Sequence, residues 1–203
     1  TIDYISLEDG ADTTRGVQNA KKLFSEQNVD AVIGPSTTPI AFAILDLVAE
    51  NKVPLLATVG TSSVVEPLDA KKRWVFKTTQ NDDLIAAALL KHMQKTGVKT
   101  VGFIGFNDPY GDNWLKVFSA LGEKVGVRVV AIERYGRTDS SVTGQTLKLI
   151  AAKPDAMLIA AVGGPAQQVN EDRFRARSGL VDRVGAKHRD RLLRLHAALD
   201  RPS

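Results

Sequence analysis

The sequence predicts an α/β protein built from two doubly wound parallel-sheet (Rossmann-like) lobes with a hinged cleft between them. Short apolar segments of strand length alternate with amphipathic segments of helix length along most of the 203 residues, as in repeated βαβ units. The polar segment Thr78–Asn81 lacks apolar periodicity and separates two similar halves. We therefore expect a partial first lobe over residues 1–79, a partial second lobe over residues 80–168, and a basic tail over residues 169–203.

The first half begins with an alternating segment, Thr1–Leu7, which is typical of a strand. Thr13 or Thr14 follows an acidic turn that contains glycine, and either residue can cap the next helix. Apolar residues at helical spacing then indicate two helices, and short apolar runs indicate three more strands. The helices are expected at 13–27 and 39–50, and the strands at 30–33, 54–58 and 74–76.

The second half repeats this alternation. Asp82 or Asp83 can cap its first helix, and Ser140 or Ser141 can cap a later one. Gly163-Gly164-Pro165 ends the last strand and opens one more helix. The strands are expected at 100–105, 127–134 and 155–161, and the helices before the last one end near residues 96, 124 and 152.

Composition excludes several classes of protein. Cysteine is absent, which excludes disulfides, thiolate catalysis and cysteine-based zinc sites. No apolar run reaches the length of about 18 residues that crosses a bilayer, so we expect no transmembrane segment. No signal peptide is visible in these residues, because the chain has no basic start followed by an apolar core.

The net charge of +4 lies entirely in the arginine-rich residues 170–203, because residues 1–169 carry equal numbers of acidic and basic side chains. This abrupt change in composition near residue 170 predicts that the two segments have different origins. Translation of the tail in a shifted reading frame would explain the difference. The alternative is a basic amphipathic helix, with Leu180 and Val184 on its apolar face, that binds nucleic acid or an acidic membrane. Groove-reading motifs are absent, so we expect no nucleic-acid partner.

Two turns that follow strands are rich in hydroxyl groups. Parallel α/β sheets bind ligands outside the carboxyl ends of their strands, and hydroxyls with free N–H groups at a helix start can hold an anion. Neighbouring strands would bring these turns side by side. Helix capping and a plain polar turn are the alternatives, although capping needs only one hydroxyl. The candidate ligand-binding residues are Ser36, Thr37 and Thr38 in the first turn and Thr58, Gly60, Thr61 and Ser62 in the second.

Tyr110 belongs to the turn Asn107–Gly111, which follows the first long strand of the second half. We expect its ring to stack on the ligand or to form a hydrogen bond from the far side of the cleft. The alternative is that Asp108 caps the helix and Tyr110 packs on it. Asp9 and Asp12 are interpreted as a solvated turn, because no further acid follows at calcium-loop spacing.

No nucleophile–base pair accompanies these turns. None of the three histidines has a serine or acid partner, and Walker, HExxH and GxSxG motifs are absent. We therefore expect a binding protein that is not an enzyme, with no cofactor and no metal site. An enzyme such as a sugar or nucleotide transferase is a further alternative, which would require a carboxylate, a histidine or a phosphate-binding loop at a strand end.

Five segments, in order and spacing, resemble the branched-chain amino-acid-binding (Leu/Ile/Val-binding-like) family of periplasmic substrate-binding proteins of ABC transporters. They are Asp30–Thr38, Val53–Thr58, Trp74–Thr79, Phe103–Gly111 and Pro154–Ile159. The resemblance covers about residues 1–168 and implies the type I periplasmic-binding fold, with the ligand enclosed between two lobes.

The resemblance also implies roles for the candidate residues. In that family, one loop of lobe 1 holds the ligand's carboxylate, the next loop holds its ammonium group, and an aromatic residue of lobe 2 covers the ligand. These roles would fall on Ser36, Thr37 (chiefly) and Thr38, on Thr58, Thr61 and Ser62, and on Tyr110. Gly163-Gly164 stands where some members carry tyrosines, which opens the side-chain pocket and argues against a branched-chain preference.

The implied function is to capture an amino acid or a similar small carboxylate for an ABC permease. The alternative is a ligand-sensing receptor or regulator domain of the same fold. The resemblance implies a parent protein that is longer at both ends, carries a signal peptide and is periplasmic or extracytoplasmic. Because the family has another strand and helix before Thr1, we expect exposed sheet edges and low stability for residues 1–203.

Overall fold

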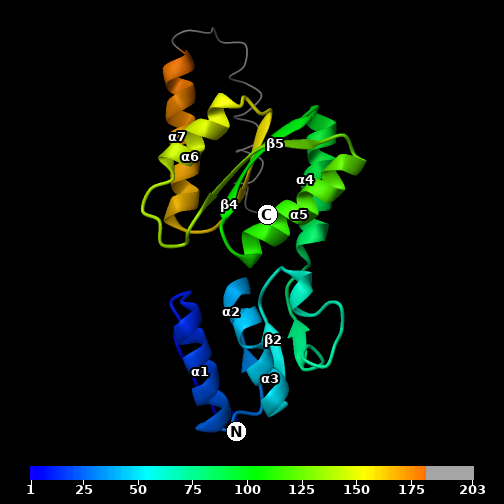
Figure 1. Ribbon diagram of the computed structural model, residues 1–203, viewed down its shortest axis with the longest axis vertical. Coiled ribbons are helices and arrows are strands. Elements are labelled where there is room, and N and C mark those ends of the chain that lie inside the picture. Colours follow the sequence, from blue (N-terminus) through cyan, green and yellow to red (C-terminus); the bar gives the residue numbers. More distant parts are fainter. Residues whose placement is uncertain (182–203) are drawn as a thin grey trace.

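The computed structural model describes residues 1–181 and contains two three-stranded parallel sheets (Figure 1). The first has the order β1-β2-β3 and the second the order β5-β4-β6. The strands are β1 (Val32–Ile33), β2 (Leu55–Ala57), β3 (Val75–Lys77), β4 (Thr100–Phe106), β5 (Arg128–Tyr135) and β6 (Ala156–Ala160). Each sheet falls within one of the two expected lobes, which we call lobe 1 and lobe 2, and the predicted α/β architecture is confirmed.

Helices connect successive strands, as the parallel sheets require. They are α1 (Thr13–Ser25), α2 (Thr38–Ala43), α3 (Leu45–Asn51), the short 3-10 helix η1 (Ser62–Val64), α4 (Asp82–Thr96), α5 (Pro109–Lys124), α6 (Thr143–Ala151) and α7 (Gly164–Val181). The expected helix over 39–50 is divided at Ile44, whose backbone leaves regular helical geometry (φ −100°, ψ 0°). Asp12 caps α1 through Oδ1, which accepts from Arg15 N at 2.7 Å, in place of the expected Thr13 or Thr14.

The prediction of a strand over Thr1–Leu7 is wrong. These residues form no strand, and Ile2 and Tyr4 are 93% and 83% exposed. Alternating polarity makes a segment suitable for a sheet, but an extended segment becomes a strand only when its backbone pairs with a neighbour. In the described chain, β1 is the edge strand of its sheet and pairs only with β2, so no strand pairs with Thr1–Leu7.

The two sheets differ in how they are covered. In lobe 2, β4 is the buried central strand, with α4 and α5 packed against Val101 and Phe103 on one face and α6 and α7 against Ile104 on the other. In lobe 1, helices α1 to α3 cover the face that carries Leu55. The opposite face carries a register-matched row, Ile33–Leu56–Phe76, whose outer members are 73% and 53% exposed.

Residues 182–203 lie outside the described part of the chain, and with them most of the basic tail, so its two interpretations stay predictions. Helix α7 extends to Val181, and Val169 near its start is fully buried against lobe 2. The expected helix after Gly163-Gly164-Pro165 is therefore present. Within residues 1–181, no helix is long and apolar enough to span a membrane.

Candidate functional site

The carboxyl edges of the two sheets face each other. Asp82 begins α4 just beyond the carboxyl end of β3, and its Oδ2 accepts from Asn113 Nδ2 in the first turns of α5 at 2.8 Å. Its backbone N–H donates to the carbonyl of Gly60, just beyond the carboxyl end of β2, at 3.1 Å. Helix α2 also contacts α5 (Figure 1). Ligands of doubly wound sheets bind at such edges, so the candidate site lies here.

The two hydroxyl-rich turns of lobe 1 lie side by side, as expected. Thr58 donates to the carbonyl of Pro35 through its backbone N–H at 3.3 Å and through its hydroxyl at 3.1 Å. Gly34 adopts a positive φ of 112°, which favours glycine at the start of the first turn. The two turns therefore form one continuous rim along the edge of the sheet.

The hydroxyls of Thr38 and Thr61 point away from solvent, into the protein. The two residues are 1% and 0% exposed, and their Oγ1 atoms are 3.1 Å apart, within hydrogen-bond distance. Thr61 also donates to Asp82 Oδ2 at 3.4 Å. These bonds occupy the two hydroxyls, so the structure gives both residues a supporting position behind the rim.

The remaining hydroxyls of the rim are placed differently. Thr37 is the N-cap residue of α2 but makes no side-chain capping bond, and its buried Oγ1 has no partner in the described chain. Capping alone therefore does not account for Thr37, and a buried hydroxyl without a partner requires an explanation. Ser36 is exposed, and Thr58 and Ser62 are half-buried. None of the ligand contacts proposed for these residues is tested by their positions alone.

Gly60 is explained by Asp82. A Cβ at position 60 would overlap Asp82 Oδ1, so only glycine allows this carboxylate to approach the second turn. Asp82 is 4% exposed, and burial raises the pKa of its carboxyl group. The sequence indicated Asp82 only as a helix opener, and nothing in its neighbourhood signalled that it is buried.

At the edge of lobe 2, Asp108 caps α5. Its Oδ1 accepts from the backbone N–H of Tyr110 at 2.8 Å and of Gly111 at 3.2 Å. Gly111 is needed because a Cβ there would overlap the carbonyl oxygen of Phe106. The capping interpretation of this turn is therefore confirmed.

Tyr110 is half-buried beside Phe106 and Trp114, with ring centroids 6.3 Å and 6.5 Å away. Burial raises the pKa of its phenol, so the hydroxyl is neutral at physiological pH and can donate a hydrogen bond. Tyr110 is thus positioned at the facing edge. Its proposed contact with a ligand stays a prediction.

Arg137 is a residue of this edge that we did not single out from the sequence. It follows β5 by two residues, and its Nε donates to Asp108 Oδ2 at 2.7 Å. Its guanidinium lies over the ring of Phe106, 4.2 Å from the centroid. The rule that directed attention to the other strand ends would have found it, had it been applied to the end of β5.

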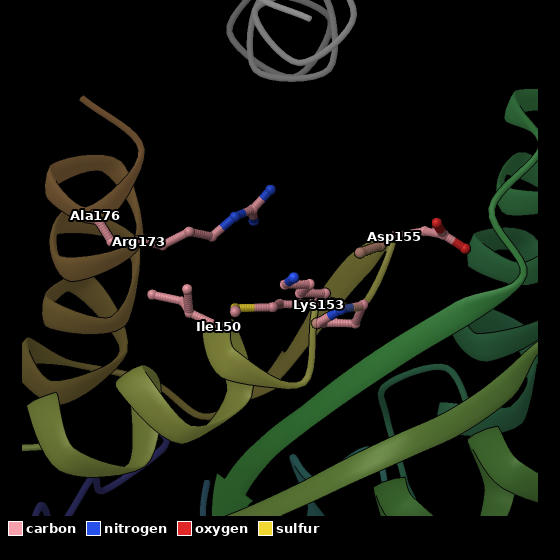
Figure 2. A pocket seen from close by; sticks show the side chains of 8 residues that line it. Ile150, Lys153, Asp155, Arg173 and Ala176 are labelled. Atoms are coloured by element: carbon pink, nitrogen blue, oxygen red, sulfur yellow. The ribbon is translucent and has the colours of Figure 1, made fainter. Parts of the chain in front are cut away.

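A surface pocket lies elsewhere, at the amino end of β6 (Figure 2). Its lining includes Ile150 of α6, Arg173 of α7 and Asp155. The Asp155 carboxylate accepts from the backbone N–H groups of Lys99 and Thr100 at 2.9 and 2.8 Å, and these bonds lower its pKa. The pocket is at the opposite edge from the one where parallel sheets bind ligands, so it is separate from the candidate site.

Within residues 1–181, no group of three or more histidine, aspartate or glutamate side chains is arranged to hold a metal ion. The facing edges instead offer hydroxyls, backbone N–H groups, a neutral phenol and a guanidinium. This set suits the recognition of an anion by hydrogen bonds.

The family is decided by a match to the whole described chain. A family model described as periplasmic binding protein matches residues 1–182. The chain belongs to the periplasmic binding protein family. The resemblance stated from the sequence is thereby confirmed, and family membership indicates an extracytoplasmic location.

Several known proteins are similar to this chain over most of the described residues. A crystal structure of an extracellular ligand-binding receptor from Rhodopseudomonas palustris HaA2 is 44% identical, with a TM-score of 0.81 over 86% of this chain and 48% of that chain. The Leu/Ile/Val-binding protein BraC3 of Rhizobium johnstonii is 25% identical over 74% of this chain and 40% of its own length. The probable metabotropic glutamate receptor mgl-1 of Caenorhabditis elegans is 27% identical over 73% of this chain and 14% of its own length. The chain thus spans about half or less of the relatives it matches.

Proposed function

We propose that this chain belongs to a solute-binding protein that captures a small organic carboxylate between its two lobes, for import by an ABC permease. The observation that carries the proposal is the rim of lobe 1. Ser36, Thr58 and Ser62 lie along it, and the buried hydroxyl of Thr37 has no partner in the described chain. The rim faces the edge of lobe 2 that holds Tyr110.

The mechanism follows from these positions. Hydroxyls and N–H groups of the rim bind the carboxylate first, and lobe 2 then closes over it with Tyr110, by a hinge movement at Thr78–Asn81. A hydrogen bond to a charged group contributes about 1.5–3 kcal/mol, so two or three such bonds account for capture. The solute is released unchanged, and the proposal requires no catalytic residue.

A ligand-sensing receptor of the same fold is the second candidate. The 27% identity to a probable metabotropic glutamate receptor favours it. Both candidates share the site, so ligand binding does not separate them. Genes for a permease and an ATPase beside the coding sequence would support import, whereas a coding sequence that continues into a membrane-spanning signalling region would support a receptor.

The test is a thermal-shift screen of the chain with leucine, isocaproate, benzoate and glutamate, followed by titration of any compound that raises the melting temperature. Thr37→Val removes the unpartnered hydroxyl and keeps the shape of the side chain. We expect it to weaken binding about 10-fold or more. Thr96→Val, at the far end of α4, removes a hydroxyl bonded within its own helix and should leave binding unchanged. Equal affinities of the wild type and Thr37→Val would contradict the role of the rim.

A further inference from the structure

Arg137 is held in a fixed orientation at the facing edge of lobe 2. Its Nε donates to Asp108 Oδ2 at 2.7 Å, and its guanidinium carbon lies over the ring of Phe106. Its side chain is only 21% exposed. A hydrogen bond from Nε and a cation–π contact together restrict the orientation of a guanidinium. Arg137 therefore pays little of the ordering entropy that a flexible surface arginine loses when it binds a ligand.

The donors of Arg137 are only partly used. A guanidinium has five N–H donors, and the bond to Asp108 engages Nε. Its two terminal nitrogens have no hydrogen-bond partner among residues 1–181. Arg134, near the end of the same strand, differs: one terminal nitrogen donates to the carbonyl of Phe106 and the other pairs with Asp112 at 2.9 Å. Two terminal N–H groups that lie side by side can bind a carboxylate through two parallel hydrogen bonds.

The acidic groups near this edge are already engaged. Asp108 caps α5 with one oxygen and binds Arg137 with the other. Asp82 is buried behind Thr61 and bonded to Asn113. Asp139, in the turn after β5, accepts from the backbone N–H of Gly136 at 2.8 Å. An ammonium group would therefore meet an oriented guanidinium here, together with three carboxylates that each already accept at least one hydrogen bond.

We propose that Arg137 is the lobe 2 contact for the acidic group of the solute, and that the solute is a carboxylate without a neighbouring ammonium group. The inference rests on the proposed function and narrows its substrate class from amino acids and carboxylates to plain organic acids. When the lobes close, the terminal nitrogens of Arg137 donate to the solute's anionic oxygens. The half-buried ring of Tyr110 then offers apolar surface to the rest of the solute.

Matched ligands test the substrate class without any mutation. Isocaproate is leucine without its amino group, and hydrocinnamate is phenylalanine without its amino group. Isothermal titration of the whole chain should give at least 10-fold tighter binding for each plain acid than for its amino acid. Equal or tighter binding of leucine and phenylalanine would overturn the inference and leave the proposed capture of a carboxylate standing.

Arg137→Gln tests the residue itself. Two lost bonds to a charged group should weaken isocaproate binding roughly 10- to 100-fold. Arg137→Lys keeps the positive charge but loses the two parallel N–H donors. Its affinity for isocaproate should therefore lie between those of the wild type and Arg137→Gln. The matched control is Arg128→Gln, which changes an exposed arginine at the amino end of the same strand and should bind as the wild type does.

The outcomes separate the two proposals. Suppose that Thr37→Val weakens isocaproate binding, whereas Arg137→Gln and Arg137→Lys leave it unchanged. That result overturns the inference alone. If the folded wild-type chain binds none of leucine, isocaproate, phenylalanine and hydrocinnamate, the proposed function and the inference are both overturned. Circular dichroism confirms that each variant is folded. If Arg137→Gln does not fold, Arg137→Lys and the ligand pairs still decide the result.

Discussion

Thr61 connects the two lobes, and replacing it with valine should destabilise the fold by an amount that the structure allows us to work out. Its hydroxyl lies 3.1 Å from the hydroxyl of Thr38 and donates to Asp82 at 3.4 Å. Valine keeps the shape of the side chain and removes both interactions. The variant leaves Thr38 with a buried hydroxyl that has lost its partner, which costs about 1–3 kcal/mol.

The contribution from Asp82 is smaller. The distance of 3.4 Å indicates a weak bond, and Asn113 still donates to the same carboxylate at 2.8 Å. We therefore expect Thr61→Val to lower the free energy of unfolding by about 2 kcal/mol. Thr38→Val should cost about 1 kcal/mol, because the hydroxyl of Thr61 retains Asp82 as an acceptor.

The double variant is the sharper measurement. Replacing both hydrogen-bond partners by apolar groups of the same shape is close to neutral for that bond. Thr38→Val/Thr61→Val should therefore cost less than the sum of the single variants, by about 1 kcal/mol. Urea unfolding followed by circular dichroism measures the cycle. Ser25→Ala, at an exposed hydroxyl of α1, is the control and should change stability by less than about 0.5 kcal/mol. Strict additivity of Thr38→Val and Thr61→Val would refute the reasoning.

Three further predictions concern other parts of the fold. Because burial raises the pKa of Asp82, its contribution to stability falls as pH rises from the ordinary aspartate pKa through the raised one. Asp82→Asn should flatten this slope in urea midpoints measured between about pH 4 and pH 7, and an unchanged slope would contradict the assignment. Gly111→Ala should cost about 1–3 kcal/mol through overlap with a backbone carbonyl, whereas Gly144→Ala, with open space around it, should be neutral or stabilising by up to about 1 kcal/mol. Ile33→Thr/Phe76→Thr should reduce aggregation measured by light scattering, because both side chains lie on an uncovered sheet face; unchanged scattering would argue against that face as its source.

Periodicity predicted most of the fold because it reports burial directly. The strand at 100–105 and the helix at 82–96 were readable because their apolar residues recur with the period of the element. The strand expected over Thr1–Leu7 failed because pairing depends on a neighbour that no local pattern reveals. The division of α2 from α3 at Ile44 left no signal in the apolar spacing.

The candidate site was predictable in its location but only partly in its details. Strand ends followed by hydroxyl groups predicted that the two turns lie side by side, and the structure confirms that placement. The pattern could not show that Thr38 and Thr61 turn inward, because three adjacent residues at a helix start point in different directions. The places of Asp82 and Arg137 in the site depend on contacts with distant residues. Asp82 bonds to Asn113, 31 residues away along the chain, and Arg137 bonds to Asp108, 29 residues away. Only the folded chain brings these residues together.

Amide hydrogen exchange of the chain with and without saturating isocaproate tests the central claim most directly. We predict slower exchange in residues 34–38, 58–63, 107–111 and 136–138, the turns that form the two facing edges. Slower exchange confined to residues 150–157 and 164–176 would place the solute in the pocket at the amino end of β6 and would contradict the account.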